Sequence, residues 1–400
     1  MMSFGERLER HSGLGPGFDF LRVALAVLIV AAHALLLTGN RSDVAPLRML
    51  EYSLLPMFFA LSGFLVTASA TRLSLGNFLI NRSLRIAPAL AVDILFCALI
   101  LGPIVTTAPL ADYLTDPRFW RYFANIFGVV HYRLPGVFET QIDPRVNGAL
   151  WTVPWEIVCY VVMSILMVSG LLKYPRIFLI GIVLYISVGI AAQHLPLAER
   201  LPTPLGLLLT KVAVGRGSQL VTAFLIGVLF FQRRGRIPYS RAMLALCVLI
   251  LLCAGVLLSG TAVKEPDNRL ILLPVITYIT IFLGLTRIPI PPWFRRGDYS
   301  YGIYLYHVPL LHLLIAAFPG LVLIPSYGAG ILFLLGLPVV LLFAAGSWHL
   351  VERPVLRLRK RFSFVARARG IDMDESAVSA PAPLPADAPA LAGASARSRS

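Results

Sequence analysis

Residues 18–38, FDFLRVALAVLIVAAHALLLT, decide the fold of this 400-residue chain. The stretch is almost entirely apolar, and about 20 apolar residues in an α-helix span the ~30 Å hydrocarbon core of a bilayer. It therefore predicts a membrane-spanning helix. Three ionisable side chains interrupt it, namely Asp19, Arg22 and His33. Because such groups are costly in lipid, they usually face a protein interior or a wet cavity.

The spacing of these residues places them on one face of the helix. Arg22 and His33 are eleven residues apart, and eleven residues turn a helix about 20° past three full turns and advance it by about 16 Å. Asp19 lies one turn before Arg22, close enough to pair with it. The helix thus presents a cation near one end and an imidazole deep in the membrane. The alternative interpretation is a snorkelling arginine and a histidine that only packs against a neighbouring helix.

The composition is that of a polytopic membrane protein. The chain is 58% hydrophobic and 14% charged, whereas a soluble domain carries about 25% charged residues. The mean hydropathy is +0.79. The four cysteines lie in apolar runs, at spacings that fit neither a disulfide framework nor a metal site. We therefore expect an all-α membrane protein without a bound metal.

Ten apolar stretches predict ten transmembrane helices. They lie at about 18–38, 52–71, 83–105, 148–171, 175–192, 219–232, 242–260, 268–286, 299–317 and 327–350. If the N-terminus is inside, the inner loops carry about twice as many Lys and Arg as the outer ones. The positive-inside rule then places both termini in the cytoplasm. This bias accounts for much of the net charge of +15, so we expect membrane lipids and no nucleic acid among the partners.

The same pattern divides the chain into four segments. We expect a cytoplasmic N-terminal segment over 1–17, a transmembrane domain over 18–358, a basic juxtamembrane segment over 359–371 and a disordered tail rich in Ala, Pro and Ser over 372–400. The long connection 106–148 is predicted outside, at the membrane interface through its aromatic residues. Residues 205–214 are expected to form a re-entrant or interfacial piece.

Polar residues on the second and third predicted spans suggest either packing or binding. Ser62 and Gly63 allow a close approach of another backbone, which ordinarily means helix packing. Arg82 and Arg85 lie one turn apart at the cytoplasmic start of the third helix. Two guanidinium groups at this spacing can form a fork for phosphate or carboxylate. The alternative interpretation is the positive-inside bias alone.

A carboxylate and further polar groups lie on later spans. Glu156 follows Trp151 in NGALWTVPWEI, a few residues into the membrane from outside. An interfacial aromatic belt explains the tryptophan but not the carboxylate. Glu156 lies at a depth comparable to His33, and a carboxylate beside an imidazole would fix its tautomer and raise its basicity. Tyr304 and His307 form a polar approach from the inside, and each is also compatible with simple packing.

Seven motifs in this order resemble the membrane acyltransferase-3 family over residues 18–358. They are FDFLRVALAVLIVAAH, PMFFALSGFLV, FLINRSLRIAP, LPGVF, NGALWTVPWEI, SYGIYLYH and LVERPVLRL. The family O-acylates surface and exopolysaccharides, lipopolysaccharide, peptidoglycan and some small molecules. The resemblance implies about ten transmembrane helices and a cytoplasmic acyl-CoA donor. The family's signature of a basic residue, ten intervening positions and then His falls on Arg22 and His33. Its Arg-x-x-Arg pair falls on Arg82 and Arg85, and its Trp/Glu element falls on Trp151 and Glu156.

The resemblance and the topology together predict a membrane-bound O-acyltransferase of the bacterial inner membrane. Acyl-CoA, with acetyl as the favoured acyl group, would be a co-substrate, and no permanently bound cofactor is implied. Arg82 and Arg85, aided by Arg22, would hold its phosphates. His33 would act as general base or become acylated, and Glu156 would orient it. Supporting residues along the channel would be Asp19, Ser62, Trp151, Tyr304 and His307. The acceptor would be a glycan or a lipid-linked sugar, with an exopolysaccharide favoured.

A transporter or flippase for a polysaccharide precursor is the alternative function. Intramembrane Arg, His and Glu also suit proton relays and anionic substrates. The sequence shows no clear inverted repeat and no pair of broken helices at matching positions, features that transporters commonly have. An acyl-CoA transfer assay separates the two functions.

Overall fold

Helices make up the described architecture of the protein. The computed structural model describes residues 2–11, 13, 15–40, 44–194, 215–257, 267–288, 297–324 and 327–362. Within these ranges the only β-structure is one isolated bridge between Ser3 and Pro238. The predicted all-α class is therefore confirmed. The predicted piece at 205–214 and the tail at 372–400 lie outside the described residues.

The helices follow the chain in the order that the apolar stretches predict. The longer ones are α2 (Phe18–Leu37), α3 (Ala45–Ala70), α4 (Leu75–Phe96), α8 (Val153–Ser169), α9 (Pro175–His194), α12 (Arg216–Gln232), α13 (Arg241–Leu257), α14 (Leu273–Gly284), α15 (Ser300–Ala317) and α16 (Gly328–Ser347). Two π-helical segments continue helices without a break, η1 (Cys97–Leu101) into α5 (Gly102–Val105) and η8 (Trp348–Glu352) into α17 (Arg353–Phe362).

Seven helices in the described part of the chain are long and apolar enough to cross a membrane. They cover residues 18–37, 46–70, 75–105, 148–169, 175–192, 300–317 and 328–357. The apolar helices at 216–232, 241–257 and 270–284 occupy three further predicted positions but are shorter. The chain is thus a multi-pass membrane protein, while ten spans and the orientation of the termini remain predictions.

The second and third predicted spans both begin earlier in the structure than predicted. The third was expected from residue 83, whereas α4 begins at Leu75. The second was expected from residue 52, whereas α3 begins at Ala45 and has Pro46 in its first turn. Proline is favoured at a helix start, because its missing N–H is not needed there and its φ is already helical. The polar residues of APLRMLEYS, which hide the helix from a hydropathy criterion, form its first two turns.

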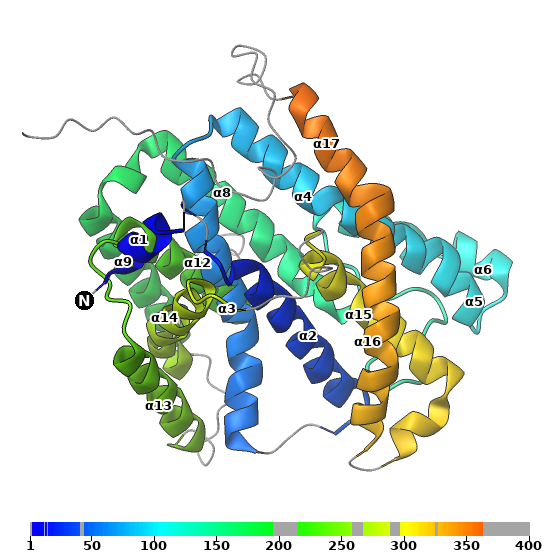
Figure 1. Cartoon of the computed structure of the whole chain (residues 1–400). Helices are drawn as coiled ribbons and strands as arrows, with labels where there is room; N and C mark the ends of the chain where they lie inside the picture. Colours follow the sequence, from blue (N-terminus) through cyan, green and yellow to red (C-terminus); the bar gives the residue numbers. More distant parts are fainter. Residues whose placement is uncertain are drawn as a thin grey trace, which may run out of the picture.

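The N-terminal helix α1 (Phe4–Glu9) docks on segments that the Lys/Arg distribution assigns to its own side. The amide of Phe4 donates to the carbonyl of Ile237 at 2.9 Å, and Arg7 Nε donates to the carbonyl of Leu285 at 3.2 Å. The chain start, the connection after α12 and the end of α14 therefore contact one another, and Figure 1 shows α1 close to α12 and α14. This grouping agrees with the predicted topology.

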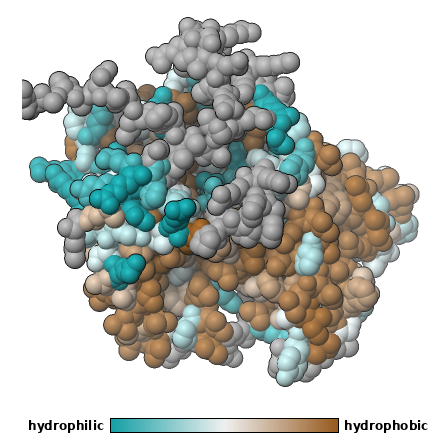
Figure 2. All heavy atoms as spheres, viewed as in Figure 1, coloured by the Kyte–Doolittle hydropathy of each residue, from teal (hydrophilic) through white to brown (hydrophobic). Residues whose placement is uncertain are grey.

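The outer surface is mostly apolar. Figure 2 shows hydrophobic residues over most of the visible face, with hydrophilic residues gathered around α1. Large exposed hydrophobic side chains on α9 and α13 include Ile180, Leu184, Leu249 and Leu252. Such a surface would cause a soluble protein to aggregate. In a membrane protein the same surface is covered by lipid.

Close backbone contact joins α3 and α12. A Cβ atom added to Gly63 would lie 2.0 Å from the carbonyl oxygen of Phe224, and one added to Gly227 would lie 2.1 Å from that of Ala60. Any larger side chain would push the helices apart. The expectation that Ser62-Gly63 serves helix packing is thus confirmed for Gly63.

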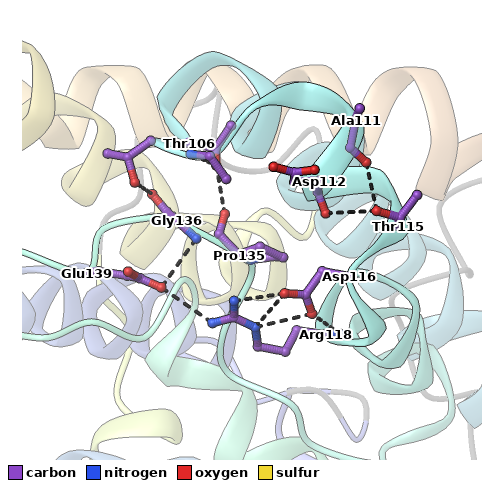
Figure 3. Close-up of polar contacts among 11 residues, drawn as sticks. Thr106, Ala111, Asp112, Thr115, Asp116, Arg118, Pro135, Gly136 and Glu139 are labelled. Carbon is purple, nitrogen blue, oxygen red and sulfur yellow. Dashed lines mark hydrogen bonds and ion pairs between the residues drawn. The ribbon is translucent and has the colours of Figure 1, made fainter.

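The long connection 106–147 is folded back on itself by its own polar contacts. Thr106 Oγ1 donates to the carbonyl of Pro135 at 2.7 Å. Arg118 pairs with Asp116 at 2.8 Å and reaches Glu139 at 3.4 Å (Figure 3). These contacts bring the two halves of the connection together over α6 (Leu110–Thr115) and α7 (Pro117–Tyr122).

Candidate active site

Helices α2 and α15 pack against each other and run in the same direction (Figure 1). Polar residues of α2 meet polar residues of α15 and of the segment just before it. Near the start of both helices, Arg22 Nη1 lies 2.7 Å from Asp298 Oδ2. Further along, the rings of His33 and His307 are edge to face, with centroids 4.6 Å apart. The prediction that Arg22 and His33 share one face of α2 is thereby confirmed, and that face points to α15 rather than to lipid.

Asp298 is the centre of an arginine cluster, which we define as Arg22, Arg85 and Asp298. Its Oδ2 accepts from Arg22 and from Arg85 Nη2, each at 2.7 Å, and its Oδ1 accepts from Ser300 Oγ at 2.6 Å. Burial raises the pKa of Asp298, but the charges of Arg85 and Arg22 outweigh this effect and hold the pKa well below its ordinary value. Asp19 is a peripheral member of the site, at 3.8 Å from Arg22 and mostly exposed.

Arg82 and Arg85 have different partners in this structure and do not form a shared fork. The guanidinium of Arg85 is held by Asp298 and lies 5.7 Å from the centroid of the Tyr301 ring. That of Arg82 lies 5.9 Å from the ring of Tyr160, and its Nε is buried without a hydrogen-bond partner among the described residues. Arg82 thus keeps a donor for a ligand, while the charge of Arg85 is shared with Asp298.

A cavity of about 170 Å³ begins at these arginines and extends between the helices. One wall is apolar and comes from α3, through Phe58, Phe59 and Leu65. The opposite wall is polar. Of the residues singled out in the sequence, those on the cavity wall are Arg22, Ser62, Arg82, Arg85, Glu156 and Tyr304. A mixed wall of this kind suits a long ligand with an apolar stem and a charged end.

Glu156 belongs to the arginine side of the cavity. Its Oε1 accepts a hydrogen bond from Tyr160 Oη at 2.7 Å, one turn further along α8. Within the described residues no hydrogen bond joins Glu156 to His33. The structure therefore brings Glu156 together with Tyr160 and places the ring of His307, instead of a carboxylate, beside His33.

Tyr304 links the cavity to the imidazoles. Its hydroxyl shares a hydrogen bond of 2.7 Å with Thr152 Oγ1, and both residues line the cavity. The carbonyl of Tyr304 accepts from His307 Nδ1 at 2.6 Å, and the two rings lie 5.9 Å apart. The ring of His307 is therefore held by a residue that lines the cavity. We refer to His33 and His307 together as the imidazole pair.

The hydrogen bond of His33 fixes its tautomer. Nδ1 lies 3.0 Å from the carbonyl oxygen of Ile29, one turn back on α2. A carbonyl can only accept, so Nδ1 carries the proton and the lone pair of a neutral ring is at Nε2. The half-buried His33 therefore presents its basic nitrogen away from its own helix.

Asn147 holds the frame of the site, and sequence reasoning did not identify it. Pro309 has no N–H, which leaves the carbonyl of Leu305 without its helical partner. Asn147 Nδ2 donates to this carbonyl at 2.9 Å and to the fully buried Asp93 Oδ2 at 2.8 Å. Its Oδ1 accepts from the amide of Ala149 at 3.0 Å. One side chain thus ties α15 to α4 and starts the turn that leads into α8.

Trp151 lies outside the cavity wall. Its ring carries the guanidinium of Arg216 at 4.8 Å, which joins the start of α12 to the turn before α8. As for metals, no group of three or more His, Cys, Asp or Glu side chains in the described part of the chain is placed to bind an ion.

The chain is similar in sequence to several known proteins. A family model described as an acyltransferase domain matches residues 16–347. The chain is 29% identical to Nodulation protein 10 of Rhizobium leguminosarum bv. viciae, over 91% of this chain and 98% of that protein. It is 25% identical to an O-acetyl transferase of Shigella phage Sf6, over 85% of this chain and 95% of that protein. No solved structure gives a significant match.

Proposed function

The chain belongs to the membrane acyltransferase-3 family, and on that premise we propose that it transfers a short acyl group from acyl-CoA to a hydroxyl of a cell-surface polysaccharide or its lipid-linked precursor. The relative named as an O-acetyl transferase supports an oxygen acceptor and acetyl as the acyl group. The single observation that carries the proposal is an arginine-lined cavity that includes Tyr304 in its wall, because the carbonyl of Tyr304 holds the ring of His307, which lies beside His33.

The arginines are proposed to receive the phosphates of the donor on the cytoplasmic side. Arg82 offers an unpaired Nε, and Arg22 and Arg85 offer guanidinium groups that Asp298 keeps in place. Guanidinium groups bind phosphate oxygens through charge-assisted hydrogen bonds. The pantetheine arm then follows the apolar wall of α3 past Ser62 and Phe58 toward Tyr304.

His33 is proposed to be the general base. Its Nε2 takes the proton of the acceptor hydroxyl while the oxygen forms a bond to the acyl carbon. The carbon–sulfur bond breaks with its electron pair on sulfur, and the proton passes from the imidazolium to the thiolate. The products are an ester and free CoA. Glu156, hydrogen-bonded to Tyr160 beside Arg82, supports the donor end of the cavity in this scheme.

The protein is proposed to lie in the bacterial inner membrane with both termini in the cytoplasm. The docking of α1 onto the connection after α12 and onto the end of α14 supports one common side for these segments. Their content of Arg supports the cytoplasmic side. The connection 106–147 would then face the acceptor from outside.

Reconstitution into liposomes tests the function against the transport alternative. Acetyl-CoA with a labelled acetyl group is supplied with a polysaccharide acceptor, and both free thiol and label on the glycan are measured. We expect thiol release that depends on the acceptor and equals the label transferred. Absence of acyl-CoA turnover, together with movement of a lipid-linked glycan across the bilayer, would favour the flippase.

A further inference from the structure

One face of α3 forms a wall of the cavity. Four side chains on this face are half-buried, whereas α3 residues between them, such as Met57 and Phe64, are buried. Residues three and four positions apart share a helix face, and the step from the first of the four to the last measures about 15 Å along the axis. The four side chains, which all line the cavity and which we call the α3 face, are Leu55, Phe58, Ser62 and Leu65.

The two ends of the α3 face meet different parts of the site. Next to Leu65, the ring of Phe64 lies 5.8 Å from that of Phe18, at the arginine end of α2. At the other end, the ring of Phe58 lies 6.2 Å from that of Tyr304. The carbonyl of Tyr304 holds one ring of the imidazole pair. The α3 face therefore runs from the arginine end of the cavity to the end at Tyr304.

The end of the cavity at Tyr304 is lined, among the described residues, by uncharged side chains. The Tyr304 hydroxyl shares a hydrogen bond of 2.7 Å with Thr152 Oγ1, which also lies 3.1 Å from the carbonyl of Ala149. These polar atoms are paired with one another, and Leu55 and the ring of Phe58 supply apolar surface beside them. The charged side chains of the lining belong to the arginine side, namely Arg22, Arg82, Arg85 and Glu156. The Tyr304 end thus suits a small apolar group, since a charged group would be buried there without a partner.

We infer that Phe58 determines the length of the acyl group and that, together with Leu55, it admits acetyl and excludes butyryl and longer acyl groups. The inference rests on the proposed function, because phosphates bound by the arginines place the thioester at the opposite end of the cavity. The acyl group then lies against the rings of Phe58 and Tyr304.

Two constraints keep the Phe58 ring in place. Its edge-to-face contact with Tyr304, at 6.2 Å and 62°, is an ordinary packing distance for two aromatic rings and leaves no space between them. On the opposite side of α3, Gly63 lies against the backbone of α12, where an added Cβ would come within 2.0 Å of the Phe224 carbonyl oxygen. The helix therefore cannot retreat from a larger ligand. An acyl group with extra methylenes must push a ring out of a packed position, which is unfavourable.

Acyl preference in a Phe58 variant tests this role. Binding of non-hydrolysable acetyl-CoA and butyryl-CoA analogues to purified protein is measured by isothermal titration, which needs no acceptor. We expect wild type to bind the acetyl analogue at least about 10-fold more tightly than the butyryl analogue. In Phe58→Ala the butyryl analogue should bind at least as tightly as the acetyl analogue, because each methylene buried in the new space raises the affinity about fourfold.

The matched control is Leu65→Ala, at the arginine end of the α3 face. It should weaken the binding of both analogues by the same factor and leave the preference for acetyl unchanged. Equal weakening of both analogues by Phe58→Ala would show that Phe58 only packs the cavity wall. Equal binding of both analogues by wild type would show that nothing excludes butyryl. Either result overturns the inference and leaves the proposed function intact.

Two further outcomes are decisive. A wild-type protein that binds neither analogue overturns both the inference and the proposed function. If Phe58→Ala does not fold, Phe58→Leu replaces it, and we expect a shift of the preference toward butyryl of at least about threefold. An unchanged preference in that variant overturns the inference.

Discussion

The arginine cluster and the imidazole pair both connect α2 with α15 or the residues just before it, and the arginine cluster also includes Arg85 of α4, but the two groups are built by opposite means. Asp298 pairs with two guanidinium groups at once, so the positive charges of the arginine cluster already have an anionic partner within the protein. Among the described residues the imidazole pair has no carboxylate hydrogen-bond partner, and the proton on Nδ1 of each neutral ring leaves the lone pair at Nε2. The first arrangement suits recognition of an anionic group, which must compete with Asp298. The second suits proton transfer, which needs an unoccupied base.

The largest effect is expected at the imidazole pair. His33→Gln removes the proposed base, and kcat should fall by about 10²–10⁴, because Gln at this position cannot take up the acceptor's proton. The rate of CoA release by purified protein measures it. His131→Gln, in the outer connection, is the matched histidine control and should turn over at the wild-type rate. A His33→Gln protein that folds and acylates normally would contradict the assignment of proton transfer to the imidazole pair.

The frame that holds the imidazole pair should respond next. Asn147→Ala removes the hydrogen bonds to the Leu305 carbonyl and to the Asp93 carboxyl together. This should lower the free energy of unfolding by about 2–4 kcal/mol and the apparent Tm in detergent by several degrees. Asn77→Ala is the control, because Asn77 is also buried but its Nδ2 has no hydrogen-bond partner in the part of the chain that the structure describes. Equal shifts in the two variants would show that the contacts of Asn147 are not what fixes α15.

Much of the fold follows from the sequence, while the partners within the site do not. Periodicity alone places Arg22 and His33 on one face of α2, and the Ser62-Gly63 pair signals close packing, since both features are local to one helix. Asp298 lies 276 residues from Arg22, in a short polar segment before α15 that no hydropathy pattern marks. An acidic residue directly before a span, on the side where the basic residues gather, is the signal that could have identified it.

Glu156 is a residue for which the sequence suggested a partner that the structure does not place beside it. Matching depth predicted that it would lie near His33, but depth fixes only one coordinate of three. The side chain meets Tyr160 one turn away on its own helix, and the helix order around the bundle decides that His307 faces His33. The π-helical segments and the role of Asn147 depend likewise on contacts between distant helices.

A moderate effect on donor binding is expected at the arginine end. Neutralising both Arg82 and Arg85 to Gln should raise the Kd for acetyl-CoA about 10–100-fold and make it less sensitive to salt, because two charge-assisted contacts to phosphate are lost. Isothermal titration at two ionic strengths measures this. Arg118→Gln, whose guanidinium pairs with Asp116 in the outer connection, should bind like wild type. An unchanged Kd in the double variant would remove the arginines from the donor site.

The smallest effect concerns the stability of the arginine cluster at acid pH. The pKa of Asp298 is lowered in the folded state, so its stabilising contribution is complete above the pKa of an unfolded aspartate, about 4, and is lost progressively as the pH falls below it. Asp298→Asn should therefore lower the apparent Tm at pH 7 by an amount corresponding to about 1–3 kcal/mol, since the partners are partly exposed. The difference between variant and wild type should shrink as the pH falls below 4. A difference that is constant with pH would contradict an ionic role.

Equilibrium binding of a non-hydrolysable acetyl-CoA analogue to the His33→Gln protein tests the division between the two regions most directly. Removal of the imidazole should leave the Kd within about twofold of wild type, in the same preparation whose CoA release has fallen at least about 100-fold. A Kd that rises in step with the loss of turnover would show that His33 holds the donor rather than performs chemistry on it.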